Sequence, residues 1–269
     1  MGIRINPMVE TGAPSVYHVS HDESKFGVPI AQKSAILEAI LAFPVTQLHV
    51  HSGSSMARTE SAVTAIRSVL DLAEEANGLL ANAGLERRID TLDIGGGLMP
   101  EILTDSPSAM MAYAQALRRT CPELWSYQLI TEFGQWSYFY TGYAYSDVEY
   151  AVQRGATRVA YVHVGADFLL RDAYVKPRGM EFIPLGDAAD RPIVRTDIAG
   201  PLCFAGDYLQ KALLLPQLEE GDGLLMLNTG SNAYALWSRH CSRTIPAVLG
   251  VDSEALEIRR LSPRTNPFV

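Results

Sequence analysis

Cysteine is scarce in this sequence: there are three among 269 residues, far apart along the chain. An odd and scattered set of thiols fits reduced cysteines better than a disulfide framework, which needs paired cysteines, or a zinc site, which needs closely spaced ligands. We therefore expect Cys121, Cys203 and Cys241 to be reduced thiols, of which at most one takes part in chemistry.

Positive charge is also sparse. Lys and Arg together number 22 against 30 Asp and Glu, the formal net charge is −8, and the basic residues form no cluster. This balance argues against nucleic acid or an anionic membrane as a partner. No apolar run reaches the roughly 18 residues that a membrane-spanning helix needs, and residues 1–4 lack the features of a signal peptide. We expect a cytoplasmic protein that acts on a small molecule.

The first 150 residues alternate between strand-like and helix-like patterns. Short apolar or β-branched runs predict strands, and longer segments with apolar residues at helical spacing predict helices. Such alternation is typical of a parallel sheet, either open or closed into a barrel. The strands are expected at 3–6, 47–50, 91–94 and 128–131, and the helices at 29–42, 59–83 and 106–120.

The pattern changes near residue 150. Beyond it, the apolar runs are short and are interrupted by Gly, Pro and Asp, which is typical of antiparallel strands. We therefore predict two domains, a β/α domain at 1–150 and a mostly antiparallel β domain at 151–269. The expected strands of the second domain are 157–164, 193–198, 223–227 and 256–260.

Three segments with functional side chains follow predicted strands of the first domain, at 49–54, 93–97 and 131–135. They are spaced by about 40 residues, the length of one strand, one helix and their loops. Because neighbouring parallel strands end at the same edge of a sheet, we expect the three segments to form one pocket.

Two of these segments have features of a phosphate site. The triplet Gly95–Gly97 allows the backbone to approach an anion closely, although a plain tight turn is an equal alternative. Ser54 offers a hydroxyl to a phosphate or else caps the following helix. His49 and His51 are expected to face opposite sides of their strand, so that one of them enters the pocket and metal binding by the pair is not expected.

Single acidic, thiol and phenol side chains complete the candidate set. Glu132 at a strand end can keep a ring nitrogen protonated through a charge-assisted hydrogen bond, or else is a carboxylate at the surface rim. Cys203, in a turn-rich segment that also contains Asp207, can deliver a proton if it is exposed, or else is a small buried residue. Tyr234 can present its hydroxyl to a phosphate or else serve in packing.

The order of these motifs resembles that of the fold-type III pyridoxal-phosphate decarboxylases of the diaminopimelate and ornithine decarboxylase type. The similarity extends from Gly2 to about Leu261 and is strongest to the diaminopimelate decarboxylase-like members. Several motifs in a fixed order identify a family more specifically than any single motif does. The motifs shared with this family are Arg4-Ile5-Asn6-Pro7, Ser24-Lys25-Phe26-Gly27, Leu48-His49-Val50-His51 with Gly53-Ser54, Asp93-Ile94-Gly95-Gly96-Gly97, Glu132 with Gly134, Gly200-Pro201-Leu202-Cys203 with Asp207, and Gly221-Asp222 followed by Gly230 and Tyr234.

The resemblance implies pyridoxal 5'-phosphate as the cofactor. His51 would stack on the cofactor ring, and Glu132 would pair with the ring nitrogen. Gln135 replaces an Arg of the family pattern that supports the phosphate region, which implies weaker phosphate binding. The phosphate would be held by Ser54, Gly95, Gly96, Gly97 and Tyr234.

The resemblance also implies decarboxylation of an amino acid or an amino-acid conjugate. Cys203 would return a proton to the substrate, while Asp207 and Arg171 would bind the substrate. Phe204 replaces a Glu that contacts the distal amino group in diaminopimelate decarboxylases, and Asp172 replaces a Pro, so the substrate is expected to differ from diaminopimelate. In this family the Cys and the Asp come from a second subunit, which implies a homodimer.

The family fold is an alanine-racemase-like (β/α)8 barrel, of which residues 1–150 would supply the C-terminal half, strands 5 to 8. The family attaches its cofactor to a lysine on the first strand, and none of Lys25, Lys33, Lys176 and Lys211 has a matching context. We expect an incomplete chain, or one that pairs with a companion segment bearing that lysine, and little turnover without it. The alternatives are a catalytically inactive paralogue that binds or regulates a full-length relative and, third, a racemase.

Overall fold

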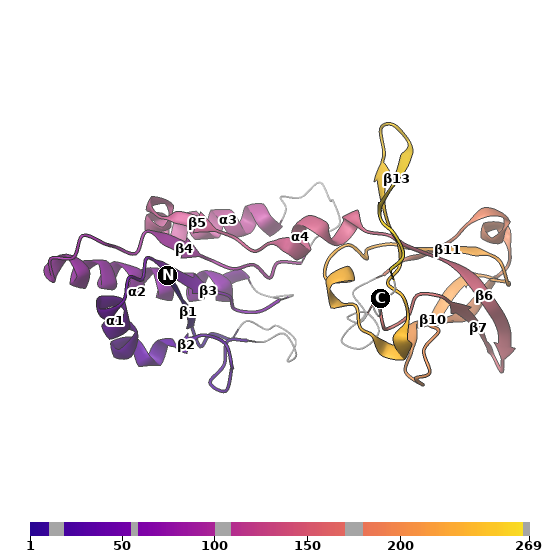
Figure 1. The fold of residues 1–269 in the computed structure, drawn as a ribbon, viewed down its shortest axis with the longest axis horizontal. Helices are drawn as coiled ribbons and strands as arrows, with labels where there is room; N and C mark the ends of the chain where they lie inside the picture. The colour runs from indigo at the N-terminus through magenta and orange to yellow at the C-terminus, as the bar shows by residue number, and fades with distance from the viewer. Residues whose placement is uncertain (11–18, 55–58, 100–108, 170–179, 266–269) are drawn as a thin grey trace. The chain divides into compact units, whose positions relative to one another are not determined.

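The computed structural model describes residues 1–10, 19–54, 59–99, 109–169 and 180–265 (Figure 1). The chain divides into two compact units, Met1–Ser137 (unit 1) and Tyr138–Val269 (unit 2). The border predicted at residue 150 falls inside strand β6 (Ala144–Arg154), whose two neighbours in its sheet both belong to unit 2. The division therefore lies earlier in the chain, because β6 is held by the second sheet.

Unit 1 contains a sheet of five parallel strands in the order β2-β1-β3-β4-β5. The predicted alternation of strands and helices is confirmed, and the two-residue strand β2 is added to it. The strands are β1 (Gly2–Asn6), β2 (Val28–Pro29), β3 (Gln47–Val50), β4 (Thr91–Asp93) and β5 (Gln128–Ile130); the helices are α1 (Lys33–Ala42), α2 (Thr59–Asn82), α3 (Ala109–Thr120) and α4 (Gly134–Tyr138), with short 3-10 helices η2 (Ile30–Gln32) and η3 (Pro122–Ser126).

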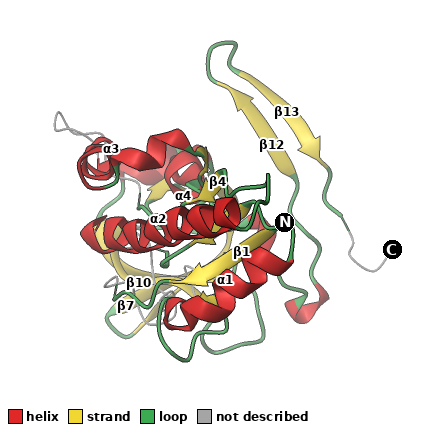
Figure 2. Cartoon of the chain, turned by 90° about the vertical axis from the view of Figure 1, so that its left-hand side faces the viewer, coloured by secondary structure: helices red, strands yellow, loops and turns green. Residues whose placement is uncertain are grey.

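One face of this sheet is apolar and is covered by helices α1, α2 and α3, which lie side by side in Figure 2. Alternate strand residues such as Leu48, Val50 and Leu92 are buried against the apolar side of α2, which includes Ile66 and Val69. This burial is what the helical spacing of apolar residues predicts. Within the described residues, no helix combines the length and apolar character that crossing a bilayer requires.

The opposite face of the sheet carries polar side chains in register. Arg4 of β1 lies beside His49 of β3, His49 beside Asp93 of β4, and Asp93 beside Ile130 of β5. Since successive side chains of a strand point to opposite faces, this row points away from the helices. A row with three ionisable residues is unusual in a parallel sheet, whose strands are commonly apolar on both faces.

Unit 2 contains a six-stranded sheet in the order β10-β9-β7-β6-β11-β8. The predicted β character is confirmed, but β7 and β9 pair in parallel, because the connection between them is a long crossover through β8 rather than a tight turn. The strands besides β6 are β7 (Thr157–Val162), β8 (Phe182–Pro184), β9 (Ile193–Ala199), β10 (Tyr208–Pro216) and β11 (Gly223–Met226), with 3-10 helices η4 (Phe139–Thr141), η6 (Gly186–Asp190), η7 (Tyr234–Leu236) and η8 (His240–Ser242).

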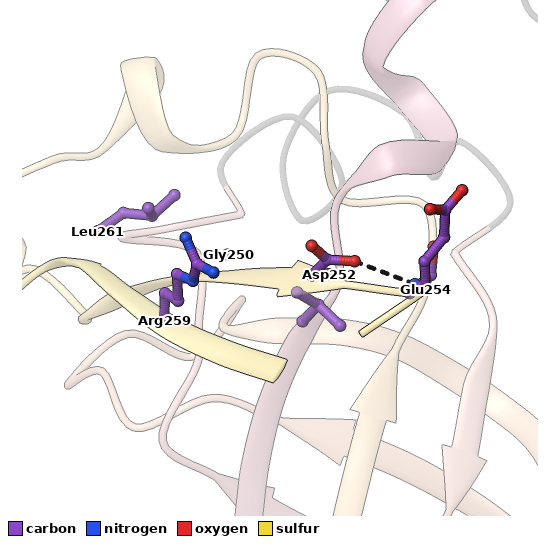
Figure 3. Close-up of a pocket in the computed structure, with 7 residues that line it drawn as sticks. Gly250, Asp252, Glu254, Arg259 and Leu261 are labelled. Carbon is purple, nitrogen blue, oxygen red and sulfur yellow. Dashed lines mark hydrogen bonds between the residues drawn. The ribbon is translucent and has the colours of Figure 1, made fainter. Parts of the chain in front are cut away.

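A separate two-stranded hairpin, β12 (Val248–Asp252) with β13 (Glu257–Ser262), ends the described chain (Figure 1). An open depression on this hairpin is lined by Gly250, Asp252, Arg259 and Leu261, among others. Figure 3 shows the carboxylate of Asp252, which accepts the backbone N–H of Glu254 at 3.0 Å. None of the residues predicted from the sequence to act in chemistry lines this depression.

Candidate functional site

The ends of strands β3, β4 and β5 meet at one edge of the parallel sheet in unit 1. Pairing between β4 and β5 continues past both strands, because the N–H of Ile94 donates to Ile130 O at 3.0 Å and the N–H of Glu132 donates to Gly95 O at 2.8 Å. The three predicted segments are therefore brought together, as the parallel topology requires.

His51 lies between the glycine segment and Glu132. Its Nδ1 accepts the backbone N–H of Gly96 at 3.2 Å and lies 3.5 Å from Oε2 of Glu132. The second contact is an ion pair only if Nδ1 is protonated, and a protonated Nδ1 cannot accept the N–H of Gly96. Burial lowers the pKa of His51, with the nearby Glu132 charge acting in the opposite direction. We therefore assign a neutral imidazole that carries its proton on Nε2.

Gly95 and Gly96 permit a close approach that no other residue allows. Gly95 has φ +66°, and a Cβ there would lie 2.6 Å from Val50 O and 2.8 Å from Nδ1 of His51. A Cβ on Gly96 would overlap the carbonyl oxygen of Glu132. The glycines are thus needed for the three strand ends to come together.

Two of the three amides in the triplet are already engaged by side chains of unit 1. The N–H of Gly95 donates to Oδ1 of Asp93 at 3.0 Å, and the N–H of Gly96 donates to His51. Within the described chain, Gly97, at φ +104°, is the member of the triplet whose amide has no such partner. Phosphate binding by the triplet remains a prediction. With the amides of Gly95 and Gly96 already hydrogen-bonded, the amide of Gly97 is the one that would donate to the phosphate.

The prediction that His49 and His51 face opposite sides was wrong. Residues two positions apart in a strand share a face, and both imidazoles approach Glu132. Nε2 of His49 lies 3.8 Å from Oε1 of Glu132 and is buried with no hydrogen-bond partner among the described residues. Divergence of the two side chains therefore gives no reason to exclude a metal ion.

Donor atoms of His49, Asp93 and Glu132 lie within 4.8 Å of one another, a spacing that can hold a metal ion. Arg4 lies in the same cluster: burial lowers its pKa, and the charges of Glu132 and Asp93 act against that effect. The positive charge of the guanidinium acts on both carboxylates and so weakens their attraction for a second cation. No role was predicted for Arg4 or Asp93, and His49 was expected in the pocket only as an alternative to His51, although each places an ionisable side chain in a short strand.

Ser54, Cys203 and Tyr234 have no described contact that tests their predicted roles. Ser54 lies in the loop after β3, in unit 1. Cys203 is exposed in the loop between β9 and β10. Tyr234 begins η7 with 44% of its surface exposed, and its ring packs edge-on against Phe168 at 6.2 Å. Arg171 lies outside the described residues.

Asp207, predicted as a substrate ligand, lies in a protein environment that this prediction did not anticipate. The residue is 3% exposed, and both of its carboxylate oxygens accept backbone N–H groups, from Ala166 and Leu202, each at 2.7 Å. Both oxygens of this buried carboxylate are thus hydrogen-bonded within unit 2, and its role as a substrate ligand remains a prediction.

Residues 1–138 match the protein family described as pyridoxal-dependent decarboxylase, pyridoxal binding domain. Diaminopimelate decarboxylase of Pseudomonas fluorescens is 28% identical over 265 residues, which are 97% of this chain and 61% of the relative. The chain therefore spans less than two thirds of the length of that relative.

Solved structures of decarboxylases have the same fold. The structure of diaminopimelate decarboxylase from Helicobacter pylori complexed with L-lysine has a TM-score of 0.81 at 24% identity, over 98% of this chain and 64% of that one. The Paramecium bursaria Chlorella virus arginine decarboxylase bound to agmatine has a TM-score of 0.71 at 20% identity, over 88% and 61%. These likenesses confirm the predicted fold class, part of a β/α barrel followed by a β domain.

Proposed function

Because the chain belongs to the family of pyridoxal-dependent decarboxylases, we propose that it forms part of an enzyme that removes the carboxyl group of an amino acid or an amino-acid conjugate. The observation that carries this proposal is the approach of His51 and Glu132, 3.5 Å apart, beside the glycine segment at the end of a parallel sheet. Sites of β/α barrels are built from these strand ends.

The residues at this edge fit pyridoxal 5'-phosphate. Arg4, Asp93 and Glu132 bring one formal positive and two formal negative charges, so a protonated ring nitrogen would balance the cluster. The neutral imidazole of His51 provides a flat surface without adding positive charge, and the buried Nε2 of His49 leaves a polar atom available to a ligand.

Glu132 would accept a hydrogen bond from the ring nitrogen and keep that nitrogen protonated. Gly97 and Ser54 would donate to the phosphate, with the hydroxyl of Tyr234 as a further donor. When bound, the cofactor supplies the electron sink for the carbanion left when carbon dioxide departs. Cys203, exposed and so accessible, would return a proton to the substrate carbon.

The substrate would be an amino acid, as the names of the relatives suggest, with Arg171 as the ligand for its carboxylate. The ring of Phe204 follows Cys203 directly and lies 6.2 Å from the ring of His240. An aromatic pair beside the proton donor favours a substrate whose far end is less polar than the ammonium group of diaminopimelate. A homodimer in which Cys203 serves the partner's site is part of the same proposal.

The lysine that attaches the cofactor would come from a segment outside this chain. Lys33 pairs with Glu75 at 2.9 Å, Lys25 lies over the ring of Phe26, and Lys211 lies over the ring of Tyr208. Each described lysine is therefore engaged away from Glu132. The second candidate function, a catalytically inactive paralogue that binds or regulates a full-length relative, is equally compatible with this observation.

Cofactor binding tests the first candidate. Pyridoxal 5'-phosphate is titrated into the wild-type chain, into Glu132→Gln, and into Glu38→Gln, which removes an exposed carboxylate on α1. We expect the wild type and Glu38→Gln to bind with equal affinity, and Glu132→Gln to bind about tenfold or more weakly, because a charge-assisted hydrogen bond is lost. Equal binding by all three would contradict the proposal.

Borohydride reduction of the loaded protein separates the two candidates. A partial enzyme should become covalently labelled, and release carbon dioxide from an amino acid, only when a polypeptide bearing the family lysine is added. An inactive paralogue should form a heterodimer with a full-length relative and gain neither the label nor turnover.

A further inference from the structure

The loop between β9 and β10 presents Cys203 at the surface while burying the residue that ends the loop. Cys203 and Phe204 are exposed, and Asp207, immediately before β10, is 3% exposed. A buried carboxylate is costly unless it is fully hydrogen-bonded, so its contacts show what it stabilises.

The carboxylate of Asp207 ties the loop to itself and to a second segment. Oδ2 accepts the N–H of Leu202 within the loop, and Oδ1 accepts the N–H of Ala166, which follows β7; both distances are 2.7 Å. The backbone of Asp207 closes the loop from both sides, because Gly200 N–H donates to Asp207 O at 2.8 Å and Asp207 N–H donates to Phe204 O at 3.0 Å.

Two glycines make room for this carboxylate. A Cβ on Gly165 would lie 2.7 Å from Oδ2 of Asp207, and a Cβ on Gly200 would overlap the same carboxylate. Neither glycine has a positive φ. Their lack of a side chain is therefore required by space and not by backbone conformation.

We propose that Asp207 is the positioning residue for Cys203: its buried carboxylate fixes the 200–207 loop on the 165–166 segment and thereby fixes the thiol. The chemical use of that thiol rests on the proposed function, but the positioning does not. Asp207 contacts no substrate in this assignment, which replaces its predicted role as a substrate ligand.

Amide hydrogen exchange and alkylation of the full chain test the proposal without cofactor or turnover. In the wild type, the amides of Leu202 and Ala166 should be protected although neither lies in a strand or helix. In Asp207→Asn at least one of the two should exchange about tenfold faster or more, because the amide side chain keeps one acceptor oxygen and replaces the other by a donor. Iodoacetamide should then label Cys203 faster, while Cys241 serves as the internal reference.

The matched control is Asp197→Asn, since Oδ1 of Asp197 accepts the N–H of Ala212 at 2.7 Å elsewhere in unit 2. This variant should leave the exchange of Leu202 and Ala166 and the labelling of Cys203 unchanged. Gly200→Ala should reproduce the effect of Asp207→Asn, which keeps the test valid if Asp207→Asn fails to fold.

Unprotected Leu202 and Ala166 amides in the wild type, or folded variants with unchanged exchange and labelling, would overturn the positioning role. A failure of Glu132→Gln to weaken cofactor binding would instead contradict the proposed function and leave the positioning role standing. The two results are therefore separable.

Discussion

The backbone N–H of Gly96 donates to Nδ1 of His51 at 3.2 Å, so the backbone after one strand sets the tautomer of an imidazole that follows the neighbouring strand. Oε2 of Glu132, 3.5 Å from the same nitrogen, would favour a proton there. Burial of the ring and donation from Gly96 act together against that proton. A neutral His51 beside the carboxyl group of Glu132 is the arrangement that a cationic ring ligand requires.

Stability should depend on pH through His51. Its pKa in the folded chain lies below the ordinary value of 6.5, so the unfolded chain binds the proton first as pH falls. The stabilisation is therefore complete above the unfolded-state pKa and is lost as pH falls through the folded-state pKa. We expect the urea midpoint of the wild type to fall more steeply below about pH 6.5 than that of His51→Gln.

The control for this prediction is His240→Gln, which removes an exposed imidazole in unit 2. It should follow the pH dependence of the wild type. Parallel pH profiles for the wild type and His51→Gln would contradict the prediction, because they would mean that the His51 imidazole has the same proton affinity in the folded and the unfolded chain.

Gly96→Ala should destabilise unit 1 by about 1–3 kcal/mol, the usual cost of forcing an extra methyl into a packed site. The added Cβ would overlap the carbonyl oxygen of Glu132, which cannot move without breaking the pairing between the ends of β4 and β5. Gly78→Ala is the matched control, because a Cβ there meets nothing within 4 Å and lies inside helix α2. It should stabilise by roughly 0.5–1 kcal/mol. Equal denaturation midpoints for the two variants would contradict the close approach.

Arg4→Met should raise the affinity of the His49, Asp93 and Glu132 cluster for a divalent cation by about tenfold, because one positive charge is removed from beside two carboxylates. Isothermal titration with zinc chloride measures the change, and Arg119→Met, at the end of α3, is the control. Tight zinc binding by the wild type, unaltered in Arg4→Met, would mean that the cluster is a metal site whose affinity the guanidinium does not limit.

The sequence predicted the sheet of unit 1 because its strands are short apolar runs that alternate with long amphipathic segments such as α2. It did not predict β6 or β10. In β6, Ser146 is buried and Tyr145 is exposed, which hides the alternating burial of the strand, and the register of β10 against β9 shifts twice. Neither strand therefore shows a regular apolar period of two in its sequence.

The candidate residues of unit 1 were found from their positions after strands, which the topology alone brings together. The exact partners could not be found in this way. The amides of Gly95 and Gly96 donate to Asp93 and His51, and the carboxylate of Asp207 is buried. These contacts depend on side-chain directions within loops, and no repeating sequence pattern determines those directions. Arg4 belongs to a sequence motif, but only the strand register places it beside His49.

The row of Arg4, His49 and Asp93 has a thermodynamic consequence for unit 1. With aliphatic packing on only the helical side of the sheet, unfolding exposes less apolar surface than in a sheet sandwiched between two helical layers. Since hydration of apolar surface dominates the heat capacity of unfolding, calorimetry of this unit should give a low value per residue and a flat stability curve. Its free energy of unfolding should accordingly change little on cooling.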